Sequence, residues 1–77
     1  MTRLEYERRR RRWNQTELAF HSRLTQSEIS QIERRRLIPS PTYAERLGRA
    51  LGLAPSGLLD EVASERTAAQ EIERVAQ

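Results

Sequence analysis

The segment at residues 26–34 has the side chains of a recognition surface. Its polar residues fall on one side of a helix and its apolar residues on the other: Gln26, Ser27, Ser30 and Gln31 against Ile29 and Ile32. Amides and hydroxyls both donate and accept hydrogen bonds. Because the major groove of B-DNA admits one α-helix and displays the hydrogen-bonding edges of the bases, a short helix of this kind suits contact with duplex DNA.

The sequence lacks the residues that catalysis or metal binding would need. Its 77 residues include no Cys, and His21 is the only His, so no clustered zinc ligands can form. No pairing of a nucleophile with a base can be drawn. We therefore predict a protein that is not an enzyme and that uses no metal and no cofactor.

Positive charge is concentrated in the first half of the chain. Residues 1–36 hold ten arginines and five acidic residues, a net charge of +5, whereas residues 37–77 hold four arginines and six acidic residues, a net charge of −2. This asymmetry favours a polyanion as the partner of the first half. No apolar run is long enough to cross a membrane and no secretory signal is evident, so we expect a cytoplasmic protein of the prokaryotic nucleoid.

Helix start signals divide the chain into short helices. Asn14 and Thr25 are each followed three residues later by Glu, the pattern of a capping box, and Ser40 precedes a proline. The sequence therefore predicts an all-α fold of five helices, at about residues 3–11, 15–22, 26–34, 41–51 and from residue 55 onward. We expect a domain at residues 1–62 and a helical C-terminal tail at residues 63–77, whose composition is rich in helix-forming residues.

The connection between the second and third helices carries a family resemblance. The sequence WNQTELA at residues 13–19 and LTQSEISQIER at residues 24–34 resembles the Cro/cI (XRE) family of helix-turn-helix DNA-binding proteins. The similarity continues through Pro39, Leu47 and the Ala-Leu-Gly at residues 50–52, and covers about residues 4–60. It implies a compact lambda-repressor-like domain that binds double-stranded DNA and regulates transcription, like small phage or plasmid repressors and restriction-modification controllers.

The resemblance also implies roles for individual residues. Residues that match base-reading positions are Gln26, Ser27, Ser30 and Gln31, with Gln26 the main one because an amide can contact adenine with two hydrogen bonds. Residues that match positions near the DNA backbone are Asn14, Gln15, Thr25, Arg34, Arg35 and Arg36. Contacts to phosphates fix register and affinity rather than sequence choice.

Two further features concern architecture. Arg8 and Glu33 match a pair that joins the first helix to the end of the third in this family, so we predict an ion pair between them. Arg23 and Arg35 stand where the family usually has Gly, and a non-Gly residue at positive φ costs roughly 1 kcal/mol. Both substitutions add positive charge near the expected DNA backbone.

Oligomeric state and partners follow from the short reading surface. One module contacts too few bases for a unique site, so we expect a homodimer on a palindromic operator. The predicted dimer surface combines the fifth helix and the tail: Leu58, Leu59, Val62, Ile72 and Val75. Two alternatives remain open, an antitoxin that binds its operator and holds a toxin protein through the tail, and a protein-interaction module that does not bind DNA.

Overall fold

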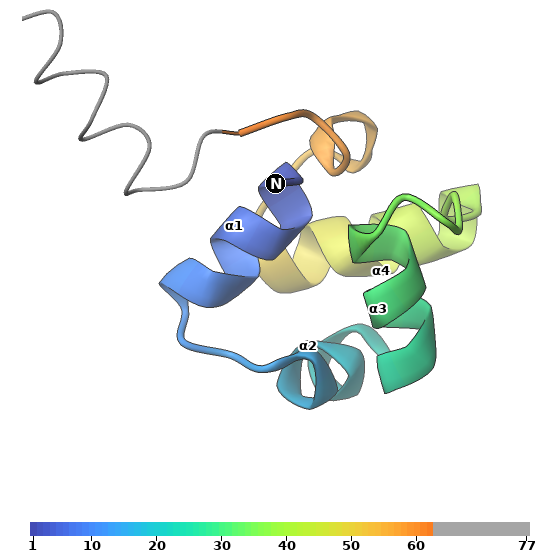
Figure 1. Cartoon of the computed structure of the whole chain (residues 1–77). Helices are drawn as coiled ribbons and strands as arrows, with labels where there is room; N and C mark the ends of the chain where they lie inside the picture. Colours follow the sequence, from blue (N-terminus) through green and yellow to red (C-terminus); the bar gives the residue numbers. More distant parts are fainter. Residues whose placement is uncertain (63–77) are drawn as a thin grey trace, which may run out of the picture.

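The computed structural model describes residues 1–62, and the predictions made for the tail, including Ile72 and Val75, lie outside this range. Its elements are α1 (Arg3–Arg10), α2 (Gln15–Ser22), α3 (Gln26–Glu33), α4 (Pro41–Leu51) and the single 3₁₀ turn η1 (Pro55–Gly57) (Figure 1). Within this part of the chain the only extended pairing is an isolated bridge between Thr2 and Glu61. The all-α prediction is confirmed. No helix among these residues is long and apolar enough to cross a membrane.

Local capping determines where the central helices begin. The Asn14 side chain accepts the backbone N–H of Glu17 at 2.7 Å, and the Glu17 carboxylate accepts the backbone N–H of Asn14 at 3.3 Å. The same reciprocal box joins Thr25 and Glu28, at 3.1 and 3.0 Å. Each box satisfies two backbone donors that a helix start would otherwise leave unpaired. The two predicted starts are therefore confirmed.

The predicted fifth helix is reduced to one 3₁₀ turn. Ala54 precedes η1 and supplies no side-chain cap, so little favours continuing the turn into a helix. The backbone beyond it bonds to the N-terminal segment instead: the N–H of Leu4 donates to the carbonyl of Leu58 at 2.9 Å, and the N–H of Arg3 donates to that of Asp60 at 2.8 Å. Residues 58–62 thus lie beside the start of α1, with Leu58 and Leu59 in a turn and Glu61 bridged to Thr2.

The core is formed where the four α-helices and the segment after η1 meet. Its buried side chains are Leu4, Leu18, Ala19, Ile29, Ile32, Leu47, Leu51 and Leu58. Leu58 is only 1% exposed, so its predicted place on a dimer surface was wrong. Its side chain seals the end of the core, an environment that stabilises a small domain by removing apolar area from water.

Candidate nucleic-acid interface

A tight turn connects α2 to α3. Arg23 ends α2 in the left-handed conformation, with φ of 60°, and the N–H of Leu24 donates to the carbonyl of Ala19 at 3.0 Å. Thr25 then caps α3, so only three residues separate the two helices. Two helices joined in this way form a helix-turn-helix unit, with α3 on the outside of the molecule.

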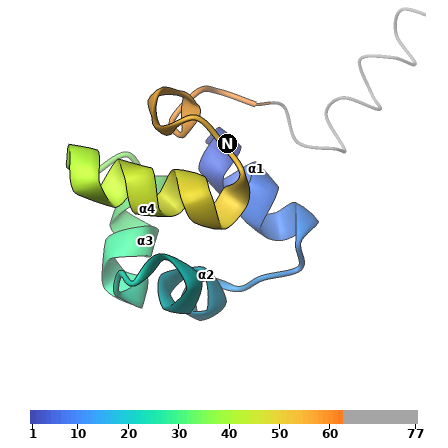
Figure 2. The ribbon, with the colours of Figure 1, turned by 180° about the vertical axis from the view of Figure 1, so that it is seen from behind.

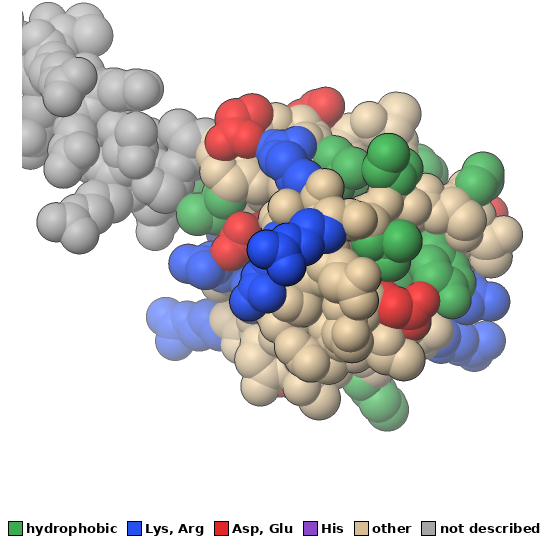
Figure 3. Space-filling model, turned by 45° about the vertical axis from the view of Figure 1, so that its right-hand side comes forward, with side chains coloured by type: hydrophobic (Ala, Val, Ile, Leu, Met, Phe, Trp, Pro, Cys, Tyr) green, Lys and Arg blue, Asp and Glu red, His purple; other side chains and the backbone are tan. Residues whose placement is uncertain are grey.

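The two sides of α3 differ as the sequence predicts. Ile29 and Ile32 are completely buried, whereas Gln26, Ser27 and Gln31 are exposed and Ser30 is half-buried. The Gln31 amide donates to the Ser27 hydroxyl at 3.1 Å, so these two side chains lie together one turn apart. Figure 3, which brings the α3 side of the molecule forward, shows a broad uncharged area bordered by arginine, acidic and hydrophobic side chains. The centre of this surface offers hydrogen bonds, and the arginines add positive charge at its edge.

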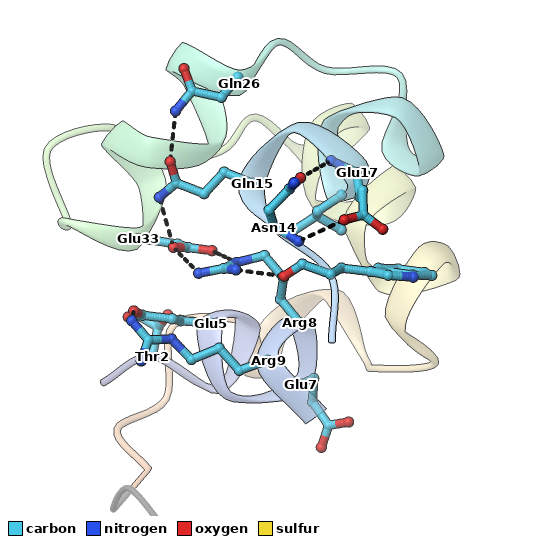
Figure 4. A network of polar contacts seen from close by, with 12 residues as sticks. Thr2, Glu5, Glu7, Arg8, Arg9, Asn14, Gln15, Glu17, Gln26 and Glu33 are labelled. Carbon is cyan, nitrogen blue, oxygen red and sulfur yellow. Dashed lines mark hydrogen bonds and ion pairs between the residues drawn. The ribbon is translucent and has the colours of Figure 1, made fainter. Parts of the chain in front are cut away.

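A chain of polar contacts connects α1 to the start of α3 (Figure 4). Arg8 donates to both oxygens of the Glu33 carboxylate, at 2.6 and 3.0 Å. Gln15 donates its amide N–H to the same carboxylate at 3.1 Å, and its carbonyl oxygen accepts a hydrogen bond from the Gln26 amide at 2.6 Å. The predicted Arg8–Glu33 pair is therefore confirmed, and it belongs to a larger network.

The ends of this network fix the orientation of both amides. A carboxylate only accepts hydrogen bonds, so Gln15 must turn its NH₂ group to Glu33 and its oxygen to Gln26. Gln26 then donates one of its two amide hydrogens to the Gln15 oxygen. Its other hydrogen and its carbonyl oxygen remain directed outward, one donor beside one acceptor.

The ion pair at the base of the network is protected from water. The side chains of Arg8 and Glu33 are 9% and 4% exposed. The third nitrogen group of Arg8 donates to the Trp13 carbonyl at 2.7 Å, so the guanidinium is bound on each side. Among residues 1–62 no buried polar side-chain atom lacks a partner. A desolvated charge pair of this geometry holds α1 and α3 in one relative orientation.

The residues predicted near the DNA backbone are divided by the structure into two groups. The first group is exposed and lies just before α2 or α3, or just after α3: Asn14, Thr25, Arg34 and Arg36. Arg35 was predicted to belong with them, but its guanidinium donates to the Leu59 carbonyl at 2.9 Å and pairs with Glu61. Arg35 therefore ties the turn after α3 to the segment at residues 59–61, a long-range contact that neighbouring sequence cannot reveal.

Sequence analysis missed a structural role for Arg11. Its guanidinium donates to the Leu51 carbonyl at 2.7 Å and pairs with Glu7 at 2.9 Å. Leu51 is the last residue of α4, so a cation here satisfies an unpaired carbonyl and complements the helix dipole. The surplus of cations in the run at residues 8–12 was the available signal, but it did not show which arginine turns inward.

An acidic residue in the first turn of α3, Glu28, lies near α4. Hydrogen bonds from the Thr25 backbone and from the Tyr43 hydroxyl hold the pKa of Glu28 below its ordinary value. The same bond to Glu28 raises the pKa of Tyr43. Glu28 therefore caps α3 and also lies near Tyr43 of α4.

Comparison with known families identifies the unit. A family model described as helix-turn-helix matches residues 4–58, which include α1 from its second residue, all of α2, α3 and α4, and η1. The chain belongs to this helix-turn-helix family, of the Cro/cI (XRE) type. Among solved structures, the helix-turn-helix chain is similar to a hypothetical transcription factor, NHTF, from Neisseria. The two are 25% identical with a TM-score of 0.66, and the match spans 96% of this chain and 75% of the other. The comparison with curated proteins gave no match.

Proposed function

We propose that this protein regulates transcription by binding a specific sequence of double-stranded DNA, with α3 in the major groove. Family membership supports DNA binding, and the outward-facing amide of Gln26 is the observation that supports sequence reading. A duplex bound there would meet Gln26, Ser27, Ser30 and Gln31 at the base edges. Asn14, Gln15, Thr25, Arg34 and Arg36 would lie toward the sugar-phosphate backbone.

The free groups of Gln26 select among the bases. Adenine presents an N7 acceptor beside an N6 donor in the major groove, the complement of the one donor and one acceptor that Gln26 keeps. Guanine presents two acceptors there, and Gln26 has only one hydrogen left to give. A good bidentate contact provides about 1–3 kcal/mol of discrimination against the wrong base. The operator is therefore expected to carry an A·T pair under each copy of Gln26.

A homodimer would provide the remaining specificity. Two helix-turn-helix units related by a two-fold axis read half-sites about 10–10.5 bp apart on one face of the duplex. Leu59 and Val62 are partly exposed at the end of the described chain and are suitable for such a contact. With Leu58 in the core, the proposed dimer surface consists of these two residues and the tail that follows.

Selection from a random duplex library, followed by titration of the selected sequence at two salt concentrations, tests the proposal. An enriched palindrome with A·T pairs at fixed positions is the expected result, and Gln26→Ala should relax the preference at those positions only. Arg36→Ala serves as the comparison, since loss of a phosphate contact weakens binding to all sequences alike and reduces the salt slope by about 1. Salt-sensitive binding with no enriched sequence would contradict the proposal.

A further inference from the structure

A second polar surface lies where the end of α2 meets α4. An open groove of about 360 Å³ is lined there by His21, Ser22, Arg23, Arg46, Arg49 and Ala50. Figure 2, the view from behind, shows α4 running above α2 on this side of the molecule. Three arginines from two elements face one hollow, so the groove is strongly cationic. Nothing in the proposed reading of DNA uses it.

Arg23 occupies this groove at a cost to the backbone. Its φ of 60° lies in the left-handed region, where a side chain is disfavoured and Gly is the ordinary choice. Arg35 has the same conformation, but its guanidinium holds Leu59 and Glu61 within the fold. Arg23 forms no ion pair with any carboxylate in residues 1–62. Packing of the domain therefore does not account for the cation in the turn.

The two arginines of α4 are only loosely engaged. Arg46 lies over the Tyr43 ring at 5.8 Å, and Arg49 pairs with Glu45 at 2.8 Å with side chains that are 80% and 57% exposed. Exposed pairs of this kind contribute little to stability, so their cations can exchange partners readily. A bound anion can therefore replace the present partners of these guanidinium groups in the groove.

The groove does not include the base-reading residues. Its lining comes from the end of α2, the turn after it and α4, whereas the base-reading residues belong to α3. Successive residues of an α-helix turn by about 100°, so Glu28 lies roughly 200° around α3 from Gln26. Glu28 lies near Tyr43 and Arg46 of α4, and Arg46 lines the groove. A ligand in the groove would therefore contact a different set of residues from those that read the duplex.

An exposed aromatic side chain lies next to the cationic groove. The His21 ring stacks on Trp13 with centroids 4.2 Å apart and meets the edge of the Phe20 ring at 5.5 Å. Phe20 itself is 81% exposed, and it is held beside the groove by this contact. Cations next to an apolar ring complement a chain segment that carries both carboxylates and apolar side chains. A simple inorganic anion has no apolar group that could pack on the ring.

We propose that this groove docks an acidic segment of a partner protein, with carboxylates bound by Arg23, Arg46 and Arg49 and an apolar side chain packed on Phe20. Planar guanidinium groups bind carboxylates with two parallel hydrogen bonds, which gives such a site direction as well as attraction. The docked segment and the duplex would be held by the same molecule at the same time. The surface is defined by the described residues alone and does not depend on the tail.

A labelled peptide tests the proposal directly. The probe is a fluorescein-tagged peptide of sequence EELEEFEE, and its control is the amide version QQLQQFQQ. By fluorescence anisotropy the acidic peptide is expected to bind at least tenfold more tightly than the amide peptide, with NMR shifts at His21, Arg23 and Arg49. Arg46→Ser with Arg49→Ser should weaken binding about tenfold. The matched control is Arg9→Ser with Arg10→Ser, which removes equal charge from two exposed arginines of α1.

Four results would overturn the proposal. The first is an equal loss of peptide affinity in the α1 control, and the second is displacement of the peptide by tripolyphosphate at matched ionic strength. The third is displacement of the peptide by duplex DNA that binds the wild-type reading surface. The fourth is unchanged peptide affinity in Phe20→Ser. The third result would mean that the groove contacts nucleic acid instead of protein. Arg23→Gly separates binding from folding, because Gly relieves the left-handed strain. It should raise Tm while weakening the peptide complex, whereas a lower Tm would assign Arg23 to the fold.

Discussion

The carbonyl oxygen of Gln15 accepts a hydrogen bond from the amide of Gln26 at 2.6 Å, although the two residues belong to different helices. Gln15 is itself held by Glu33, which also binds Arg8. The orientation of the reading amide is therefore set by a buried ion pair two side chains away. This arrangement links the stability of the domain to the base preference that we propose for it.

Gln15→Ala should reduce specificity through Gln26. Without Gln15 as its hydrogen-bond partner, the Gln26 amide can rotate by about 180° and exchange the positions of its NH₂ group and its oxygen. It can then no longer distinguish a base edge that presents a donor and an acceptor from an edge that presents them in the opposite order. We expect discrimination at the A·T position to fall while Gln26→Ala adds little further loss, a coupling of about 0.5–3 kcal/mol for contacting residues. Affinities of the two single variants and the double variant for the selected operator and its A·T-substituted form measure this coupling. Strictly additive losses would show that the two glutamines act independently.

Breaking the Arg8–Glu33 pair from one side should destabilise the domain severely. Arg8→Ala leaves a carboxylate that is almost fully buried without its cation, at a cost of about 3–5 kcal/mol of unfolding free energy. Arg8→Met combined with Glu33→Leu removes both charges and should recover most of that loss. Urea unfolding curves of the three proteins provide the comparison.

The charge-free double variant also separates folding from reading. It folds on this argument, but it no longer orients Gln15, so base discrimination should fall as it does in Gln15→Ala. Binding of the double variant to the selected operator and its substituted form is the measurement. If the folded double variant discriminates between the bases as well as the wild type does, the ion pair does not contribute to base recognition.

Sequence reasoning succeeded where the determinants are local. The capping boxes at Asn14 and Thr25 are complete within four residues, so the starts of α2 and α3 could be predicted from the sequence alone. The fifth helix was predicted to be longer than it is because the path of this segment depends on a hydrogen bond from the backbone of Leu4, more than fifty residues earlier in the chain.

The same distinction applies to the interface. Which side of α3 is exposed follows from helical periodicity, and the Arg8–Glu33 pair came from the family resemblance. The contact of Arg35 with the C-terminal segment depends instead on Glu61, in a segment whose path is set by tertiary contacts. Likewise, no local pattern places Arg23 beside two arginines of α4.

Acid should weaken the fold in part through Glu28. Its pKa is lowered in the folded state by hydrogen bonds from the Thr25 backbone and Tyr43, so the folded protein prefers the ionised form. The resulting stabilisation is present above the unfolded pKa of Glu28 and is lost as the pH falls through the lower, folded value. Glu28→Gln can still form a capping box but has no charge to lose. We expect its Tm to depend less steeply on pH than that of the wild type across the acid range below 4.5, the ordinary pKa of a glutamate side chain.

The control for this titration is Glu45→Gln, which removes a carboxylate from one exposed pair on α4. Thermal unfolding of the three proteins at a series of pH values, at constant ionic strength, gives the slopes. If Glu28→Gln and Glu45→Gln lose stability in acid along the same curve as the wild type, Glu28 does not contribute to the acid sensitivity.

Two arginines in the left-handed conformation, Arg12 and Arg35, should respond differently to replacement by glycine. Arg12 and Arg35 have φ values of 58° and 61°, so Gly relieves about 1 kcal/mol of backbone strain at either position. Arg12 has no ion-pair partner within residues 1–62, so Arg12→Gly should raise Tm by about 4–8 °C for a domain of this size. Arg35→Gly also removes the bonds to Leu59 and Glu61, and the loss of these contacts should cancel or reverse the gain. Calorimetry of both variants decides the matter: an equal rise in Tm would mean that the Arg35 contacts contribute nothing to holding the C-terminal segment against α3.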